Sequence, residues 1–485
     1  MESLFLDFGA AQMRKRGYEL SNTLSPNLDT VRLRAVWNSC DADDVKSVVR
    51  RYIQNSTSGP EKLVQEEVQG WTEVFAAYWK AVGELLAIQD PPSTNGLSTR
   101  SSWTRVYDTW KEMLSALIRG YNTYGFEAWT IPCLYVAGKY LRVFAIKADA
   151  ERNSGNSHEN GGAANFQDDF NPESEQNEKL EDCARQLNRV FNLCLSDRAP
   201  LDESRKWGIY HVINLLFKTY FKLNSASLSK NILKALSAGR GDMPDLSVFP
   251  ASQQVTFKYY EGVLYFLEEN YVEAEKHLTE AWGLCHKDAM RNKELILTYL
   301  IPCHLLTTHT LPTQRLLERY PRLQKFFLPL AKCIKRGELH AFDLALQEGE
   351  DEFVKRRIYL TLERGRDIAL RNLLRKVFIA GGFEEPKEPG GPRVRRTRIP
   401  IAEFAAAISL GSQETLDNDE VECLLANMIY KVSQVLHTIA SPTRRHSWRV
   451  PLRNLELPNL MKGYIARERG ILVLSKNGAF PGTGV

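Results

Sequence analysis

The stretch FKYYEGVLYFLEENYVEAEKHLTEAW, residues 257–282, decides the fold, because it predicts two helices that fold back on each other. Small and aromatic residues lie at the offsets of a tetratricopeptide-like unit; they are Gly262, Tyr265, Tyr271, Ala274, Leu278 and Ala281. Small residues let two antiparallel helices approach closely, and aromatic side chains fill the remaining space. We therefore predict a helical pair over 256–269 and 272–285, either as one unit of a helical-repeat stack or as an isolated helical hairpin.

Helical periodicity extends well beyond this pair. Residues 61–89 and 101–121 place apolar side chains at steps of three and four, and Pro91 ends the first of these helices. The most apolar window, 126–146, contains three charged residues. A charge at the centre of a bilayer is costly, so this window predicts a buried helix and no membrane span.

The chain divides into four parts. An N-terminal helical region covers 1–149. The segment 150–178 is rich in Asn, Ser, Gly and Glu and holds few large apolar residues, so we predict a disordered linker there. Residues 179–352 hold the helical repeats, and 353–485 form a separate C-terminal module.

The C-terminal module has the element order of a winged helix. Its expected elements are a long basic helix over 353–380, a short helix over 401–410, a third helix over 417–431 and a β-hairpin over 464–474. The fold class that we predict is therefore all-α, with a tetratricopeptide-like solenoid followed by a winged helix that ends in a small β-hairpin.

Charge is distributed unevenly along the chain. The net charge is +8 over 353–400, −6 over 401–430 and +7 over 431–485, whereas residues 1–352 carry −5. Arginines beside a winged helix suit contacts with phosphate groups, which supply affinity without reading a base sequence. The candidate nucleic-acid-binding residues are Arg371, Arg375, Lys376, Arg393, Arg395, Arg396, Arg398, Arg467 and Arg469. A site for an acidic protein and a solvated basic face are the alternatives, and Arg393–Arg398 also resembles a short nuclear-localisation patch.

Motifs of catalysis are missing from the sequence. It contains no P-loop, no dinucleotide-binding glycine pattern, no G-x-S-x-G and no H-E-x-x-H. His304 and His309 lie near Cys303, but their position at a helix end favours structural roles. The eight cysteines form no C-x-x-C pair, which favours reduced cysteines in the nucleus or cytosol. We expect no enzymatic activity, no metal, no cofactor and, from the acidic N-terminus, no secretory signal.

Several stretches resemble one known family. They are 257–282 above, YLIPCHLL (299–306), FFLPLAKCIKRGELHAFDLAL (326–346), YLTLERGRDIALRNLLRKVF (359–378), DNDEVECLLANMIYK (417–431) and GYIARERGILVLSK (463–476). Together they resemble the PCI domain, which subunits of the proteasome lid, the signalosome and a eukaryotic translation initiation factor share. With MESLFLDFGAAQMRKRGYELSNTLSP at the start, the chain resembles the fungal signalosome-subunit-12-like branch. That branch is related to the PCI subunit of the transcription-coupled mRNA-export complex.

The resemblance implies a scaffold role in a nuclear, and also cytoplasmic, multiprotein complex. It implies a second PCI subunit as partner through the winged helix, a small acidic protein along the helical face, and RNA or DNA on the basic surface. The alternative that it leaves open is a protein-interaction subunit of a signalosome- or lid-like assembly without nucleic-acid binding. Residues 432–462 depart from the family pattern as an atypical insert, which is either genuine or an unspliced intron.

Overall fold

The structure is a computed structural model, and it describes residues 1–27, 30–57, 63–89, 101–159, 177–384, 395–412, 416–439, 460–476 and 478–481. The chain folds into two compact units, Met1–Tyr260 and Glu261–Val485. Helices dominate both units, and the described strands belong to one small sheet near the C-terminus. The all-α prediction is therefore confirmed.

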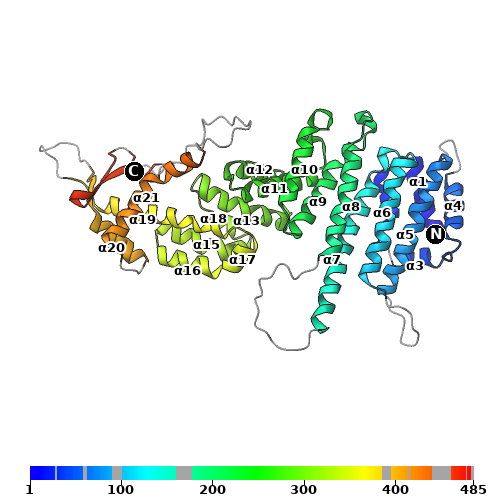
Figure 1. Cartoon of the computed structure of the whole chain (residues 1–485), viewed down its shortest axis with the longest axis horizontal. Helices are drawn as coiled ribbons and strands as arrows, with labels where there is room; N and C mark the ends of the chain where they lie inside the picture. Colours follow the sequence, from blue (N-terminus) through cyan, green and yellow to red (C-terminus); the bar gives the residue numbers. More distant parts are fainter. Residues whose placement is uncertain are drawn as a thin grey trace. The chain divides into compact units, whose positions relative to one another are not determined.

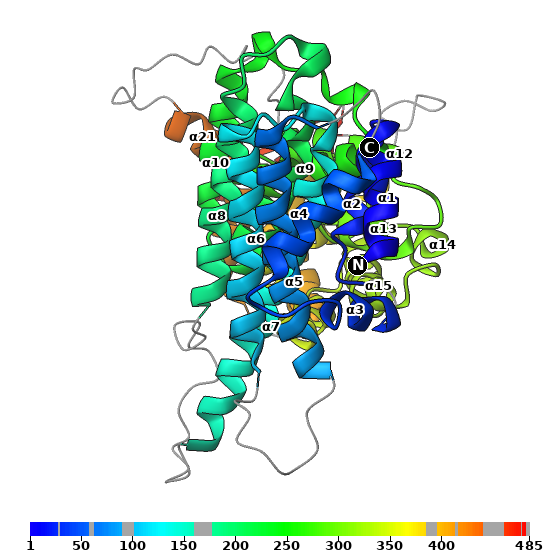
Figure 2. The same ribbon diagram turned by 90° about the vertical axis from the view of Figure 1, so that its right-hand side faces the viewer.

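The first unit is a layered array of helices. They are α1 (Glu2–Met13), α2 (Gly17–Thr23), α3 (Thr30–Trp37), α4 (Val45–Ser56), α5 (Gln65–Gln89), α6 (Trp103–Thr123), α7 (Pro132–Glu159), α8 (Glu178–Leu195), α9 (Ile209–Lys222) and α10 (Ser227–Ala238), with the 3-10 turns η1 (Ala128–Thr130), η2 (Leu201–Glu203), η3 (Arg205–Gly208), η4 (Arg240–Asp242) and η5 (Leu246–Val248). The long helices α5, α6, α7 and α8 lie side by side in sequence order, as Figure 1 and Figure 2 show.

An aromatic core holds the N-terminal helices of this unit together. Phe8 of α1 meets Trp71 and Phe75 of α5 edge to face, at ring-centroid distances of 5.4 and 5.3 Å. Trp110 of α6 packs on Phe144 of α7 and donates its indole N–H to a buried carbonyl on the same helix. Large aromatic side chains bury much apolar surface, and such edge-to-face pairs add to its stabilisation.

The second unit begins within α11 (Ala251–Leu267). Its other helices are α12 (Tyr271–Leu284), α13 (Met290–Thr307), α14 (Gln314–Leu317), α15 (Pro321–Arg336), α16 (Leu339–Glu348), α17 (Glu350–Lys355), α18 (Tyr359–Glu363), α19 (Gly365–Ala380), α20 (Ile401–Ser412) and α21 (Asn418–Ile439); the strands are β1 (Arg398–Pro400), β2 (Gly463–Ala466) and β3 (Ile471–Leu474), and η7 (Arg467–Arg469) joins the last two.

The predicted helical pair is present as α11 and α12. A side chain at Gly262 would place its Cβ 2.7 Å from Cγ of Leu278, so the helices meet where the sequence has no side chain. One turn further on, the rings of Tyr265 and His277 stack at 5.3 Å. The packing follows the predicted pattern, in which a small residue permits contact and an aromatic one fills the adjoining space.

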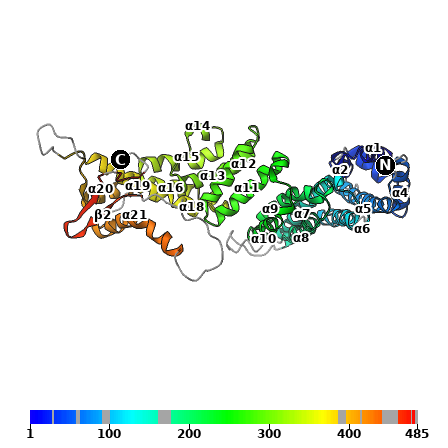
Figure 3. The same ribbon diagram turned by 90° about the horizontal axis from the view of Figure 1, so that it is seen from above.

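A winged helix closes the C-terminus. The three strands form an antiparallel sheet in the order β1-β3-β2, and Figure 3 shows β2 beside α20 and α21. Ile399 and Leu472 are fully buried under the helices, and Gly470 takes a left-handed backbone (φ +60°) between β2 and β3. The hairpin is confirmed, whereas β1 is an additional strand that the sequence analysis did not predict.

Two predicted boundaries are wrong. The linker expected over 150–178 begins later, because α7 continues to Glu159; the carboxylate of Asp149 accepts hydrogen bonds from the main-chain N–H groups of Lys179 and Leu180 and ties this end of α7 to α8. The expected single helix over 353–380 is three helices, α17, α18 and α19. Arg357 takes a left-handed backbone (φ +57°) that a helix cannot accommodate, which separates α17 from α18. Residues 160–176 of the linker lie outside the described part.

The predicted insert also starts differently. Helix α21 does not end at Lys431 but continues to Ile439, so the first residues assigned to the insert 432–462 are helical. The described chain resumes at Leu460 and enters β2 three residues later. Residues 440–459 lie outside the described part, so the genuine insertion and the unspliced intron both stay open as explanations.

Candidate nucleic-acid interface

The outer face of the winged-helix sheet combines positive charge with an exposed aromatic ring. Strand register places Arg398 of β1 and Tyr464 of β2 on either side of Val473 in β3. Residues paired in this way point to the same face of a sheet. Arg398 is exposed and Tyr464 is 60% exposed, whereas the neighbouring row on the opposite face is buried around Leu472.

A second row lies next to the first. The main-chain N–H of Ser475 donates to the carbonyl of Lys462 (2.9 Å), and the N–H of Leu474 donates to the carbonyl of Thr397 (2.9 Å). Alternation along each strand therefore puts Lys462 on the same face as Tyr464, and Arg396 on the same face as Arg398. Lys462 is exposed. We call the set Arg398, Lys462, Tyr464 and Val473 the wing face.

The wing face extends the predicted site in a way that the sequence analysis missed. Neither Lys462 nor Tyr464 was among the candidate residues, although Tyr464 begins the predicted hairpin and Lys462 lies two positions before it. Period-two alternation of exposed side chains was the available signal. The candidate residues follow clusters of positive charge, which leaves out both an aromatic residue and a lysine that stands apart from those clusters.

One predicted residue is not on the surface at all. Arg371 is 5% exposed, its Nε donates to the carbonyl of Leu460 (3.0 Å), and its Nη2 donates to the carbonyl of Pro481. Burial, with a smaller effect of nearby Arg375, lowers its pKa. The prediction that Arg371 contacts nucleic acid is therefore wrong, because its guanidinium fastens both ends of the C-terminal segment to α19.

Ion pairs reduce the free charge at two further positions. Arg396 lies 3.1 Å from Glu403 in the first turn of α20, and Arg467 lies 3.6 Å from Glu422 of α21. The side chain of Arg467 is nevertheless 78% exposed, so its pair is solvated and weak. Both positions stay near the wing face, but each brings a carboxylate with it.

Three of the remaining candidates, Arg375, Lys376 and Arg395, lie on α19 or next to its aromatic side chains. The guanidinium of Arg395 lies 4.9 Å from the ring centroid of Phe383 and 5.5 Å from that of Phe378. Lys376 is exposed and donates to the carbonyl of Arg336, and Arg375 is half-buried. Arg469 is exposed in the turn before β3, whereas Arg393 lies outside the described residues.

Chemistry of other kinds finds no support in the described residues. They contain no group of three or more His, Cys, Asp or Glu side chains that could hold a metal, and no helix among them is long and apolar enough to cross a membrane. Burial raises the pKa of Cys183 and Cys194 to about 12, so these thiols are poor nucleophiles. His304 lies 3.0 Å from Glu275, as expected of a structural histidine.

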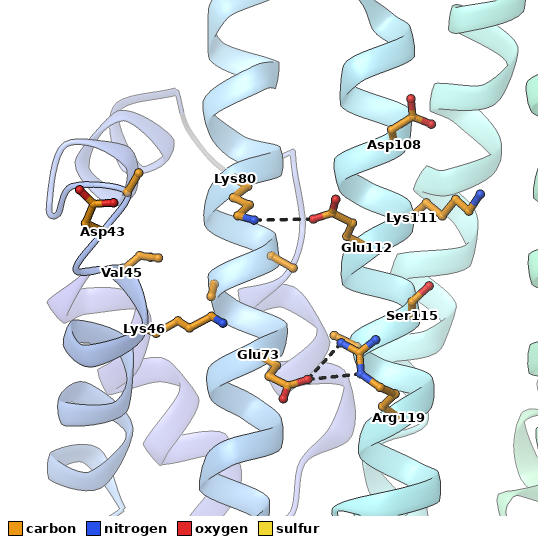
Figure 4. A pocket seen from close by; sticks show the side chains of 14 residues that line it. Asp43, Val45, Lys46, Glu73, Lys80, Asp108, Lys111, Glu112, Ser115 and Arg119 are labelled. Atoms are coloured by element: carbon orange, nitrogen blue, oxygen red, sulfur yellow. Dashed lines mark hydrogen bonds and ion pairs between the residues drawn. The ribbon is translucent and has the colours of Figure 1, made fainter.

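A groove in the first unit lies between α4, α5 and α6 and has a volume of about 960 Å³. Figure 4 shows its rim, where Lys80 lies 3.8 Å from Glu112 and Arg119 lies 3.0 Å from Glu73. The four basic and four acidic residues that line it cancel in charge. This balance gives the groove no preference for an anion or a cation.

Fold and surface together define a class of protein, in which helical repeats run into a winged helix with a basic sheet face. No protein-family model matches the chain. It is 70% identical to the Protein CSN12 homolog of Neurospora crassa over the full length of both chains. It is 34% identical to the Protein CSN12 homolog of Schizosaccharomyces pombe over 85% of this chain and 83% of that one.

A vertebrate relative extends the comparison. The chain is 30% identical to PCI domain-containing protein 2 of Danio rerio over 76% of this chain and 77% of the relative. The chain therefore belongs to the PCI-domain family of CSN12 homologs, and the resemblance inferred from sequence is confirmed.

Proposed function

We propose that this PCI subunit is a non-catalytic scaffold of a nuclear complex and binds RNA or DNA through the wing face, in transcription-coupled mRNA export or processing. The observation that supports the proposal is the cross-strand row of Arg398, Val473 and Tyr464. It places a cation and an accessible ring on one surface without a carboxylate between them.

Such a surface suits a nucleic-acid strand for two physical reasons. Lysine and arginine beside the backbone release counterions from the phosphates, which supplies affinity that falls as salt rises. An exposed tyrosine offers a flat face on which any base can stack. Lys462 and Arg398 flank Tyr464 on this surface, so both contributions are available within one small sheet.

The partner proteins belong to the same proposal. Leu410 of α20 is 83% exposed, and Phe383, which follows α19, is 54% exposed. Exposed large apolar side chains on a small module support its pairing with another PCI subunit, because burying them on association is favourable. The resemblance also implies a small acidic subunit along the helical face, and the proposed assembly is therefore at least ternary.

A binding measurement tests the nucleic-acid role. Fluorescence anisotropy of the full chain with a labelled single-stranded RNA and with a DNA duplex, from 50 to 300 mM salt, should give affinities that fall steeply as salt rises. The double variant R398E/K462E should weaken binding by about tenfold or more and reduce the salt slope by about one or two. Charge reversal adds repulsion to the loss of two phosphate contacts.

A matched control distinguishes an effect of the wing face on binding from an effect of net charge. Arg319 and Lys332 are exposed on the helical part of the same unit, so R319E/K332E changes the net charge equally. This control should bind within about twofold of the unaltered chain, because salt screens charges that do not contact the bound strand. Equal weakening by both double variants would contradict a role of the wing face.

The alternative function is a protein-interaction subunit without nucleic-acid binding. The ion pairs Arg396–Glu403 and Arg467–Glu422 favour it, because they reduce the positive charge available to phosphates. The same titration distinguishes the two functions. If the unaltered chain binds neither RNA nor DNA at 50 mM salt, only the scaffold role remains.

A further inference from the structure

Helices α7 and α9 of the first unit run parallel and meet at two levels. The rings of Tyr135 and His211 stack at 4.0 Å, and Nη2 of Arg142 donates to the carbonyl of Lys218 at 3.0 Å. Both pairs are separated by the same 76 positions in the chain. The levels are therefore one heptad apart on each helix, which corresponds to about 10 Å along the axis.

Positive charge gathers between and at these levels. Lys139 lies on α7 one turn after Tyr135, and Arg142 follows on the same stripe. Lys218 supplies a third permanent cation from α9, and His211 adds an imidazole. We call Lys139, Arg142, His211 and Lys218 the α7–α9 cluster.

No described carboxylate neutralises this cluster. None of its four members forms an ion pair with a described Asp or Glu, and the charges that perturb the pKa of His211 and of Lys218 are all cations of the cluster. One heptad beyond Arg142 on α7 stands Asp149, but its two oxygens accept main-chain hydrogen bonds from the start of α8. These hydrogen bonds hold the Asp149 carboxylate at the start of α8, one heptad away from Arg142.

Burial makes this arrangement costly. Nε of Arg142 and Nε2 of His211 are both buried without a hydrogen-bond partner in the structure. Desolvation lowers the pKa of Arg142, of Lys218 and of His211, the last to about 4. Arg142 and Lys218 are half-buried, whereas Lys139 is exposed at the edge of the cluster. Half-buried cations that repel each other are retained at a loss of stability, unless a bound anion compensates them.

We propose that the α7–α9 cluster is a binding site for a phosphate monoester ligand, distinct from the wing face. A phosphate monoester carries close to two negative charges and three acceptor oxygens, so it can accept from Arg142, Lys139 and Lys218 at once. A carboxylate neutralises only one of the three permanent cations. Three permanent cations exceed the charge of one phosphate monoester, so the cluster suits a ligand that carries more than one phosphate.

The experiment measures binding of three probes to the full chain by calorimetry at 150 mM salt. The probes are inositol hexakisphosphate, a doubly phosphoserine-bearing peptide and a hexaglutamate peptide. Both phosphate probes should bind, and hexaglutamate should bind about tenfold more weakly or not at all. Tighter binding of the phosphopeptide identifies a phosphorylated protein segment as the source, and tighter binding of the inositol phosphate identifies a small metabolite.

Two double variants locate the site. R142Q/K218Q should raise the Kd for the phosphate probes by about tenfold or more, because each removes a charged donor. The matched control R50Q/K46Q changes the same residue types on exposed positions of α4 and should leave the Kd within about twofold. Thermal unfolding without ligand should show R142Q/K218Q to be at least as stable as the unaltered chain, since repulsion is relieved.

Three results would overturn the proposal. They are failure of both phosphate probes to bind, equal loss of binding in the two double variants, and binding of hexaglutamate as tight as that of the phosphate probes. Nucleic-acid affinity distinguishes the α7–α9 cluster from the wing face. R142Q/K218Q should leave the affinity for RNA and DNA unchanged. A parallel loss of nucleic-acid affinity would assign the cluster to the same ligand as the wing face, against this proposal. If R142Q/K218Q does not fold, binding of the phosphate probes is measured on H211Q instead, which keeps all three permanent cations.

Discussion

The guanidinium of Arg371 donates a hydrogen bond to the main-chain carbonyl of Pro481, 110 residues further along the chain. A second hydrogen bond from the same side chain reaches Leu460, where the described chain resumes before β2. One arginine of α19 thus holds the segments before and after the hairpin. Its role is in the stability of the winged helix and not in the recognition of a ligand.

Removal of this arginine should destabilise the winged helix. R371A should lower the free energy of unfolding by about 2–4 kcal/mol, because two carbonyl groups lose a charged donor inside the fold. Urea unfolding followed by circular dichroism measures the change. R469A, at an exposed arginine of the same module, should alter it by less than about 0.5 kcal/mol. A loss below about 1 kcal/mol in R371A would contradict the assigned role.

Substitutions at two glycines of the helical pair should have opposite effects on stability. G262A should destabilise the chain by about 1–3 kcal/mol, because the new Cβ would lie 2.7 Å from Cγ of Leu278. G283A near the end of α12 meets nothing within 4 Å and should be neutral or stabilising by up to about 1 kcal/mol. Thermal or urea unfolding of both variants measures the difference, and equal effects would show that the two helices do not pack at Gly262.

His211 should make the stability of the folded chain sensitive to acid. Burial, reinforced by Lys218 and Lys139, lowers its pKa from 6.5 to about 4 in the folded chain. The unfolded chain therefore takes up the proton first, so the contribution is complete above about pH 6.5 and falls as the pH drops towards 4, by at most about 3 kcal/mol.

The variant H211Q isolates this contribution from the titration of carboxylates. The difference in unfolding free energy between H211Q and the unaltered chain should change in favour of H211Q between pH 6.5 and pH 4.5. The ring proton signals of His211 in NMR spectra should titrate well below the ordinary histidine pKa of 6.5. A difference that stays constant with pH would contradict the lowered pKa.

Tyr464 should contribute through its ring and not through its hydroxyl group. If the proposed function holds, Y464A should weaken binding to single-stranded RNA by about 1–3 kcal/mol, whereas Y464F should bind nearly as well as the unaltered chain. The salt slope should stay unchanged in both, because no phosphate contact is lost. Anisotropy titrations measure both quantities, and an equal loss in the two variants would exclude stacking.

Periodicity and residue type predicted most of the helical architecture but not its local breaks. The α11–α12 pair could be predicted because Gly262 and the residues around it combine size and spacing in one pattern. The break at Arg357 could not, because an arginine with a positive φ carries no mark in the sequence. Strand β1 is only three residues long and includes Pro400, so it resembles a loop.

The candidate site was predicted in part for similar reasons. Arg398 and Arg469 lie on the surface as expected, but charge alone cannot tell an exposed arginine from a buried one. Arg371 shares a stripe with Leu374 and Phe378, which are buried, so spacing did contain a signal of its burial. Pairing with Glu403 or Glu422 depends on tertiary contacts, which no local pattern reports.

The short strands of the sheet also have a consequence for solubility. Among the described strands β1 and β2 form its two open edges, and such edges can recruit further strands into fibrils. Here one edge is three residues long, begins with an exposed arginine and ends in a proline, which lacks the N–H that a growing ladder requires. The β1 edge of the sheet therefore resists the addition of a further strand and with it the growth of polymers.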